Sequence, residues 1–172
     1  MNASAIRPEQ ELFSLSSAVA ERLGAGRQTV AVAESCTGGM LGAAFTDVPG
    51  SSAYFLGGVI AYADDVKRRQ LGVPAGLLDA HGAVSAQAAA AMATGVRALL
   101  QADIGLSVTG VAGPAEEEHK PAGLTFIGLA DGAAEATTRS YRWQGDRWSN
   151  RRQSVRAALQ LLLDRLPAEE KS

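Results

Sequence analysis

Short apolar segments alternate along the chain with longer segments in which apolar residues recur every three or four positions. The short segments predict buried strands at residues 29–33, 54–62, 103–108, 124–129 and 137–143. The longer segments predict helices at residues 12–23, 40–48, 66–71, 86–101 and 146–166. Strands that alternate with helices in this way indicate an α/β fold.

This order of elements predicts a single-domain three-layer α/β/α sandwich around a mixed, largely parallel sheet. No helix separates residues 124–129 from residues 137–143, so this last pair of strands is what makes the sheet mixed. A chain of 172 residues suits one domain, 1–172, with a core at about residues 10–166 and frayed ends. Ligands of such sheets bind beyond the strand ends.

Several local signals refine these elements. The pair Gly57 and Gly58 interrupts the second strand and predicts either a bulge or a close approach by another group. Asp64 and Asp65 are expected to cap the helix at 66–71, and Ser85 is expected to cap the alanine-rich helix at 86–101. The glycine-containing segment 24–26 predicts the end of the first helix.

Charge and composition exclude several classes of protein. The 16 basic and 18 acidic residues give no electrostatic footprint for nucleic acid or for an anionic membrane. A single cysteine excludes an internal disulfide framework and fits a reducing compartment. No apolar run approaches the roughly 20 residues that span a bilayer, and no signal-peptide core precedes the first helix, so a cytoplasmic protein is expected.

Candidate chemistry begins directly after the first strand. Ser35, Cys36 and Thr37 place three hydroxyl or thiol groups in a row before the pair Gly38 and Gly39. A glycine turn that opens a helix presents backbone N–H groups, which favour an anion or a developing oxyanion. The same residues equally suit a turn in which a serine or threonine only caps the helix.

Ser35 would need a general base, because a serine hydroxyl is a weak nucleophile at neutral pH. Neither histidine, His81 or His119, lies in a recognisable triad motif. An α/β-hydrolase elbow is excluded, since Ala33 and Thr37 stand where its glycines belong. A lysine therefore becomes the candidate base.

Lys67 is one of only three lysines in the chain. To accept a proton near pH 7, a lysine needs its pKa lowered by about 3 units from the reference value of about 10.4, through burial or a nearby cation. The alternative is a solvated helix face that Lys67 shares with Arg68 and Arg69. Tyr62 could relay a proton or orient the amine, or it could be a packed ring with a hydrated hydroxyl.

Three other groupings are weaker candidates. Cys36 with His81 would make a thiol hydrolase, although a small buried cysteine under the turn is the simpler interpretation. Arg147 and Arg151, four residues apart on the last helix, could bind a phosphate or could both be solvated. No spacing of histidines and cysteines matches a metal site.

Five spaced motifs then agree with one known family. They are Ala33-Glu34-Ser35-Cys36-Thr37-Gly38-Gly39, Phe55-x-Gly57-Gly58 leading to Tyr62 and Lys67, His81-Gly82-Ala83-Val84-Ser85, Thr109-Gly110-Val111-Ala112-Gly113-Pro114, and Lys120-Pro121. Over roughly residues 10–165 the chain resembles the CinA C-terminal domain family, the nicotinamide-nucleotide amidohydrolases or NMN deamidases. The resemblance implies hydrolysis of nicotinamide mononucleotide to nicotinic acid mononucleotide and ammonia, which recycles pyridine nucleotide.

The resemblance also implies roles for individual residues. Ser35 becomes the nucleophile, Lys67 its general base and Tyr62 a residue that assists proton transfer. It implies no metal and no organic cofactor, and a homo-oligomer is expected. The remaining positions that it places at the substrate are Thr109, Gly110 and Gly113 in the second glycine turn, with Arg147 and Arg151 in a Gly-Asp-Arg-x-x-hydrophobic-Arg pattern that has Asn150 at its hydrophobic place.

Backbone donors at Thr37, Gly38 and Gly39 are expected to stabilise the oxyanion, an inference from turn chemistry alone. One segment departs from the family: residues 115–119 read Ala-Glu-Glu-Glu-His where a glycine-rich loop is usual. Its carboxylates would oppose a phosphorylated substrate unless the loop points into solvent, which is the interpretation that we favour. Otherwise the chain could be a nucleotide-binding or partner-binding module with weak or no amidase activity.

Overall fold

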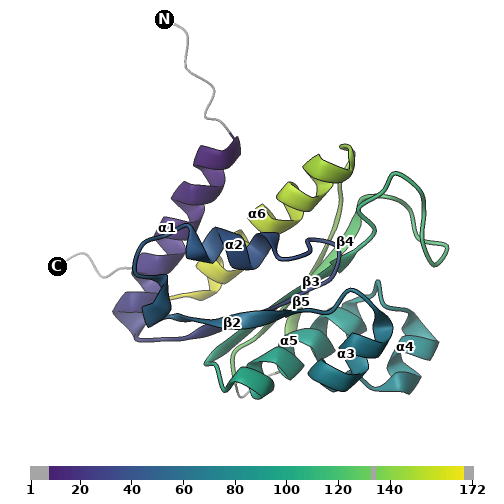
Figure 1. The fold of residues 1–172 in the computed structure, drawn as a ribbon, viewed down its shortest axis with the longest axis horizontal. Helices are drawn as coiled ribbons and strands as arrows, with labels where there is room; N and C mark the ends of the chain where they lie inside the picture. The colour runs from purple at the N-terminus through teal and green to yellow at the C-terminus, as the bar shows by residue number, and fades with distance from the viewer. Residues whose placement is uncertain (1–7, 133–134, 169–172) are drawn as a thin grey trace, which may run out of the picture.

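A five-stranded sheet with strand order β2-β1-β3-β4-β5 forms the middle layer of the protein (Figure 1). The computed structural model describes residues 8–132 and 135–168, so the predicted frayed N-terminal residues 1–7 lie outside the described part. The strands are β1 Val30–Glu34, β2 Phe55–Ile60, β3 Ile104–Gly110, β4 Leu124–Ala130 and β5 Thr137–Arg142. The helices are α1 Pro8–Gly26, α2 Met40–Thr46, α3 Asp64–Leu71, α4 Ala75–His81, α5 Ala86–Leu100 and α6 Arg147–Arg165, with a 3₁₀ turn η1 at Ser51–Ala53.

The sheet is mixed, as predicted. Strands β2, β1 and β3 pair in parallel, whereas β4 is antiparallel to both β3 and β5. Four of the five strands therefore run in one direction. Helices α1, α2 and α6 cover one face of the sheet and α3, α4 and α5 cover the other, which confirms the three-layer α/β/α sandwich (Figure 1).

The two faces of the sheet are packed differently. Large side chains such as Phe45, Leu23 and Leu159 fill the layer beneath α1, α2 and α6. The opposite layer is rich in alanine, and α5 lies very close to the sheet there. A Cβ atom added at Gly105 would lie 2.0 Å from the carbonyl oxygen of Ala93, so only glycine permits this approach.

Both alternatives for the glycine pair in β2 are realised. The register passes from Val30 opposite Phe55 to Ala31 opposite Gly57, which leaves Leu56 as the extra residue of a bulge. A Cβ atom at Gly58 would lie 2.4 Å from Val32 Cγ2, so β1 also approaches closely. The bulge thereby sets the register between the two strands that lead to the candidate site.

Two predicted helix boundaries were wrong. Asp64 and Asp65 do not cap α3 but lie in its first turn, after Ala63 at the cap position, because both carboxylates pair with cations farther along the helix. The first helix continues through Gly26, and Arg27 makes the left-handed turn instead, with φ of 50°. Ser85 does cap α5, since its hydroxyl accepts the N–H of Ala88 at 3.1 Å.

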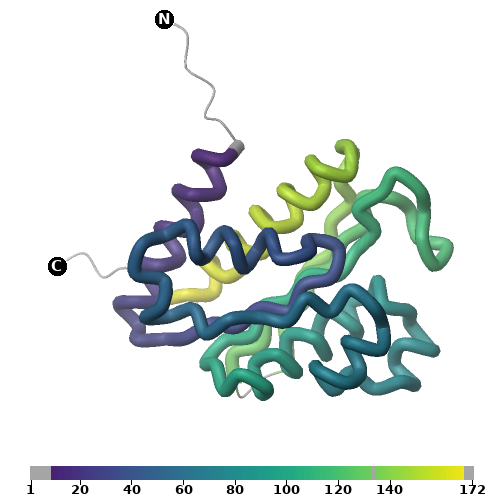
Figure 2. The backbone as a smooth tube through the Cα atoms, viewed as in Figure 1, coloured from purple at the N-terminus to yellow at the C-terminus, as the bar shows by residue number. Residues whose placement is uncertain are grey.

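Helix α4 was not predicted at all. It spans seven residues after Pro74 and carries too few apolar positions to show a helical period. Between β3 and β4 the chain leaves the sheet as a long loop, drawn in green in Figure 2. Among the described residues, no helix has the length and apolar character needed to cross a membrane.

Candidate active site

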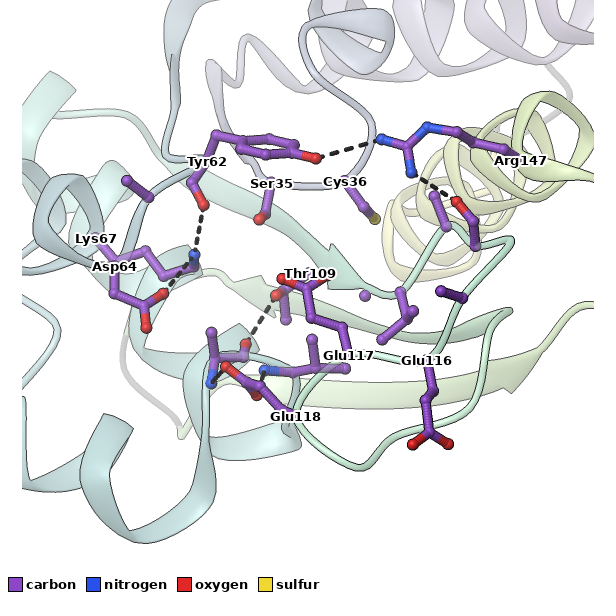
Figure 3. A pocket seen from close by; sticks show the side chains of 18 of the residues that line it. Ser35, Cys36, Tyr62, Asp64, Lys67, Thr109, Glu116, Glu117, Glu118 and Arg147 are labelled. Carbon is purple, nitrogen blue, oxygen red and sulfur yellow. Dashed lines mark hydrogen bonds and ion pairs between the residues drawn. The ribbon is translucent and has the colours of Figure 1, made fainter.

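A cavity of about 470 Å³ opens at the carboxyl ends of the three parallel strands. Ser35 directly follows β1, Tyr62 lies two residues beyond β2, and the segment after Thr109 closes β3. Parallel strands end at the same edge of a sheet, so this topology brings together residues that are far apart in the sequence. Figure 3 shows Ser35, Tyr62, Lys67 and Thr109 around this one space.

The turn that carries Ser35 is held by its own backbone. The N–H of Ser35 donates to the carbonyl of Val108 at 2.9 Å, and the Ser35 carbonyl accepts the N–H of Gly38 at 3.1 Å. The Ser35 hydroxyl points into the cavity and makes no hydrogen bond within the described residues 8–132 and 135–168 (Figure 3). The backbone of Ser35 is thus held in place, and its hydroxyl is free of protein partners in that part of the chain.

Glu34 accepts the backbone N–H groups that have no helical partner at the start of α2. Its buried carboxylate accepts hydrogen bonds of 2.8–3.0 Å from three backbone N–H groups, those of Gly39, Leu41 and Gly42. The alternative of a serine or threonine cap is therefore wrong: Gly39 occupies the cap position, and the buried Thr37 hydroxyl has no partner in the described part of the chain.

These hydrogen bonds exclude two of the three expected oxyanion donors. The N–H groups of Gly38 and Gly39 are already used, by Ser35 and Glu34 respectively, and Thr37, Gly38 and Gly39 do not line the cavity. Within the described ranges, the N–H groups of Cys36 and Thr37 donate to no protein oxygen. These two N–H groups belong to the residues that directly follow Ser35.

Lys67 is buried, with only 2% of its side chain exposed. Its Nζ donates to the carbonyl of Tyr62 at 3.2 Å and to Asp64 Oδ1 at 3.1 Å. A solvated face shared with Arg68 and Arg69 is therefore wrong for Lys67, although it describes both arginines. Lys67 and Ser35 both line the cavity (Figure 3).

Tyr62 is not the packed ring that one interpretation expected, because 61% of it is exposed. Its backbone carbonyl, not its hydroxyl, is what orients the Lys67 amine. The hydroxyl instead accepts a hydrogen bond of 3.3 Å from Arg147 Nη2, so the ring lies along one rim of the cavity (Figure 3).

The second glycine turn forms another wall of the cavity. Thr109, Gly110 and Gly113 all line it. The Thr109 hydroxyl donates to the carbonyl of Ala83 at 2.8 Å, which ties this wall to the turn before α5. Asn150 supports the wall from behind, since its amide donates to the Ala112 carbonyl at 3.0 Å.

The two arginines of α6 serve different places. Arg147 lines the cavity and donates to the Gly113 carbonyl at 2.7 Å. Arg151 is not among the lining residues: it donates to the Thr37 carbonyl at 2.7 Å, and its guanidinium lies 5.5 Å from the centroid of the Trp148 ring. The pair does not present two parallel cations to one phosphate.

The acidic loop, residues 115–119, is exposed to solvent, but it does not lie away from the site as we expected. Its residues 115–118 line the cavity. Glu118 anchors it, because its carboxylate accepts the N–H groups of Ala83 and Val84 at 3.2 and 3.3 Å, and Lys120 Nζ lies 3.4 Å from the same group. These long-range contacts hold the loop at the site, which residue types alone do not reveal.

Cys36 is a buried residue under the turn. Burial raises the pKa of its thiol to about 12, so the thiolate is scarce at neutral pH. His81 is exposed and does not line the cavity, so the two do not form a thiol–imidazole pair. Among the residues described, no group of three histidine, cysteine, aspartate or glutamate side chains is placed to hold a metal ion.

Sequence reasoning missed two carboxylates at this site. Glu34 ends an apolar strand just before a glycine turn, a place where a charged residue must find partners if it is buried. Asp64 precedes Lys67 by three residues, which is the spacing of neighbours on a helix. Both signals are visible in the sequence once the helix starts are correctly placed.

The fold and the cavity together define an α/β protein with a serine and a buried lysine at the carboxyl edge of a parallel sheet. A model of the CinA C-terminal domain matches residues 12–166, and the chain belongs to this family. CinA-like proteins of Frankia casuarinae and Thermosynechococcus vestitus are 55% and 51% identical over 134 and 135 residues, 78% of this chain in each case. The chain spans about a third of the length of these relatives, 31% and 32%.

Solved structures agree with the family assignment. A competence-damaged protein (CinA) superfamily protein from Klebsiella pneumoniae is 34% identical with a TM-score of 0.86, and the match covers 89% of this chain and 96% of that one. A competence/damage inducible protein from Agrobacterium tumefaciens is 33% identical with a TM-score of 0.86, over 90% and 94% of the two chains. The similarity thus extends over nearly the whole fold.

Proposed function

We propose that this protein is a nicotinamide-nucleotide amidohydrolase, which hydrolyses nicotinamide mononucleotide to nicotinic acid mononucleotide and ammonia. The observation that carries the proposal is that the buried Lys67 and the unbonded Ser35 hydroxyl line one cavity. A lysine removed from solvent and a serine with no competing partner are the two groups that a Ser-Lys acyl transfer needs.

The first half of the reaction forms an acyl-enzyme. Ser35 Oγ attacks the carboxamide carbon while its proton passes to Lys67 Nζ, which acts as the general base. The negative charge that develops on the carbonyl oxygen is stabilised by the N–H group of Cys36, which lines the cavity and donates to no other oxygen in the described chain. The new ammonium of Lys67 is stabilised by Asp64 and by the Tyr62 carbonyl.

Loss of ammonia completes the acyl-enzyme, and water then releases the acid. The tetrahedral intermediate breaks its C–N bond, and Lys67 returns the proton to the departing nitrogen, so that ammonia leaves. A water molecule then attacks the ester carbon and gives its proton to Lys67. Collapse of this intermediate breaks the bond to Ser35 Oγ, which regains a proton from Lys67, and the carboxylic acid is released.

The test is to mix purified protein with nicotinamide mononucleotide and to measure ammonia and the acid together. Ser35→Ala and Lys67→Met should each lower turnover by about three orders of magnitude, as the loss of a nucleophile or base does. Arg68→Met, which removes an exposed cation from the same helix, is the matched control and should retain turnover. Absence of turnover in the wild type, or full turnover by Ser35→Ala, would refute the proposal.

One observation favours a second function, a nucleotide-binding module with little or no amidase activity. Residues 116–118 line the cavity, and the Glu117 carboxylate, which points into it (Figure 3), opposes the productive binding of a phosphate. This function predicts that calorimetry detects nucleotide binding, that ammonia is not released, and that Lys67→Met leaves the affinity unchanged.

A further inference from the structure

We infer that Glu117 is a specificity-determining residue that makes the cavity discriminate against a phosphate on the substrate. The inference rests on the proposed function, since it concerns which carboxamides the amidohydrolase accepts. It concerns relative affinity: Glu117 weakens the binding of the phosphorylated substrate compared with N-glycosylated pyridinium carboxamides that carry the ring cation but no phosphate.

The direction of the Glu117 side chain is the first step. Figure 3 shows its carboxylate pointing into the cavity, toward the region of Thr109, whereas the carboxylate of the neighbouring Glu116 points away. Glu117 makes no ion pair and no side-chain hydrogen bond within residues 8–132 and 135–168. Its negative charge therefore acts on whatever enters the cavity.

The loop is also held in place, so this charge stays at the site. The backbone of Glu117 exchanges two hydrogen bonds with that of Lys120, at 2.8 and 3.1 Å. Lys120 Nζ in turn donates to the His81 carbonyl at 2.8 Å, and Glu118 accepts the N–H groups of Ala83 and Val84. These hydrogen bonds oppose a swing of the loop into solvent.

Four acidic residues line the cavity, Asp64, Glu116, Glu117 and Glu118, against two basic ones. Two cations line it, but Lys67 is paired with Asp64 at 3.1 Å, which leaves Arg147 as the one cation there without a carboxylate within ion-pair distance among the described residues. Glu118 is partly neutralised by Lys120. An incoming dianionic phosphate therefore meets a surplus of negative charge, whereas a pyridinium cation is attracted.

Nicotinamide mononucleotide and nicotinamide riboside isolate this effect, because they share the cationic ring and the carboxamide and differ only by the phosphate. We would measure the dissociation constants of both by calorimetry in Ser35→Ala protein, where neither is consumed. Their ratio cancels every contribution of the ring. The same ratio of kcat/KM values would be measured with Ser35 restored.

Glu117→Gln is expected to shift both ratios toward the phosphorylated ligand by about tenfold, the effect of removing one charge at a few ångströms in a partly hydrated site. Glu117→Lys should shift them further. Glu116→Gln, which removes the same charge from the same loop, should shift them by less than about twofold. Added salt should favour the phosphorylated ligand more in the wild type than in Glu117→Gln, a readout that a purely structural role would not move.

Equal shifts in Glu116→Gln and Glu117→Gln, or no shift in either, would overturn the inference. The binding ratio keeps it separate from the proposed reaction. If no form of the protein releases ammonia but the ratio of dissociation constants shifts as described, then the amidohydrolase proposal fails and the role of Glu117 stands. If ammonia is released but the ratio is insensitive to Glu117, the reverse holds.

Discussion

Lys67 Nζ lies 3.1 Å from Asp64 Oδ1, one turn earlier on the same helix. The lysine side chain is buried and the aspartate side chain is about half exposed, so the ion pair has one buried and one hydrated partner. In the proposed reaction, Asp64 is the residue that would compensate the charge of Lys67 when the amine takes up a proton.

Asp64→Asn is expected to lower kcat for ammonia release by about tenfold with KM nearly unchanged, because the protonated amine loses its counter-charge in the transition state. The asparagine keeps an oxygen that can accept from Lys67, so folding should be retained. Asp65→Asn is the matched control, since Asp65 pairs with exposed arginines on the same helix. Equal losses of kcat in both variants would show that Asp64 only stabilises helix α3 and does not compensate the charge of Lys67.

Glu34→Gln is expected to lower the free energy of unfolding by about 2–4 kcal/mol. The glutamine has one acceptor oxygen, so its NH₂ group would face a backbone N–H that now donates to Glu34. Urea unfolding measures the change. Glu11→Gln, at an exposed ion pair with Arg156, should cost less than about 1 kcal/mol.

Cys36 is expected to resist thiol reagents at pH 7–8 in the folded protein, because burial raises its pKa to about 12. Reaction with a chromogenic disulfide should need denaturant, and Cys36→Ala should keep ammonia release. Rapid labelling of the folded protein would contradict this prediction.

The same shift makes stability depend on pH. A thiol whose pKa is raised on folding contributes stability that is fully present below its unfolded pKa of about 8.5 and is lost as pH rises toward the folded value of about 12. Between pH 9 and 10 the wild type should therefore lose about 1 kcal/mol more than Cys36→Ala, as measured by urea unfolding. Parallel pH profiles would count against a buried, neutral thiol.

Arg147→Met is expected to weaken substrate binding, whereas Arg151→Met is expected to lower stability. Arg147 lines the cavity, so its loss should raise KM for the nucleotide by about tenfold with little change in stability. Arg151 supports the turn after Ser35, so its loss should lower the free energy of unfolding by about 1–2 kcal/mol. The two readouts, taken on both variants, distinguish a ligand contact from a support.

Much of this arrangement could be predicted from the sequence. Burial on both sides makes β1 a nearly continuous apolar run, and a parallel sheet then brings the residues after β1 and β3, Ser35 and the turn beyond Thr109, to one edge. The spacing of Tyr62 and Lys67 after β2 brings them to the same edge. These are local patterns combined with one rule of topology.

The features that could not be predicted depend on contacts between distant segments. The direction of the acidic loop is decided by Glu118 meeting Ala83 and Val84, 35 and 34 residues earlier in the chain. The availability of backbone donors in the turn after Ser35 depends on which of them Glu34 already occupies. Neither is encoded in the residue types of the segment that it controls.

The bulge at Leu56 lies at the start of β2, whereas the cavity lies beyond its end. Without that extra residue, everything after it would slip by about 3.3 Å along β1 and turn to the other face of the sheet. The Ala61 N–H, which now donates to the Glu34 carbonyl at 2.7 Å, fastens the two strands in the shifted register, one residue short of Ser35 and of Tyr62. The distance between Ser35 and Lys67 thus depends on one extra residue, Leu56, at the far end of a strand.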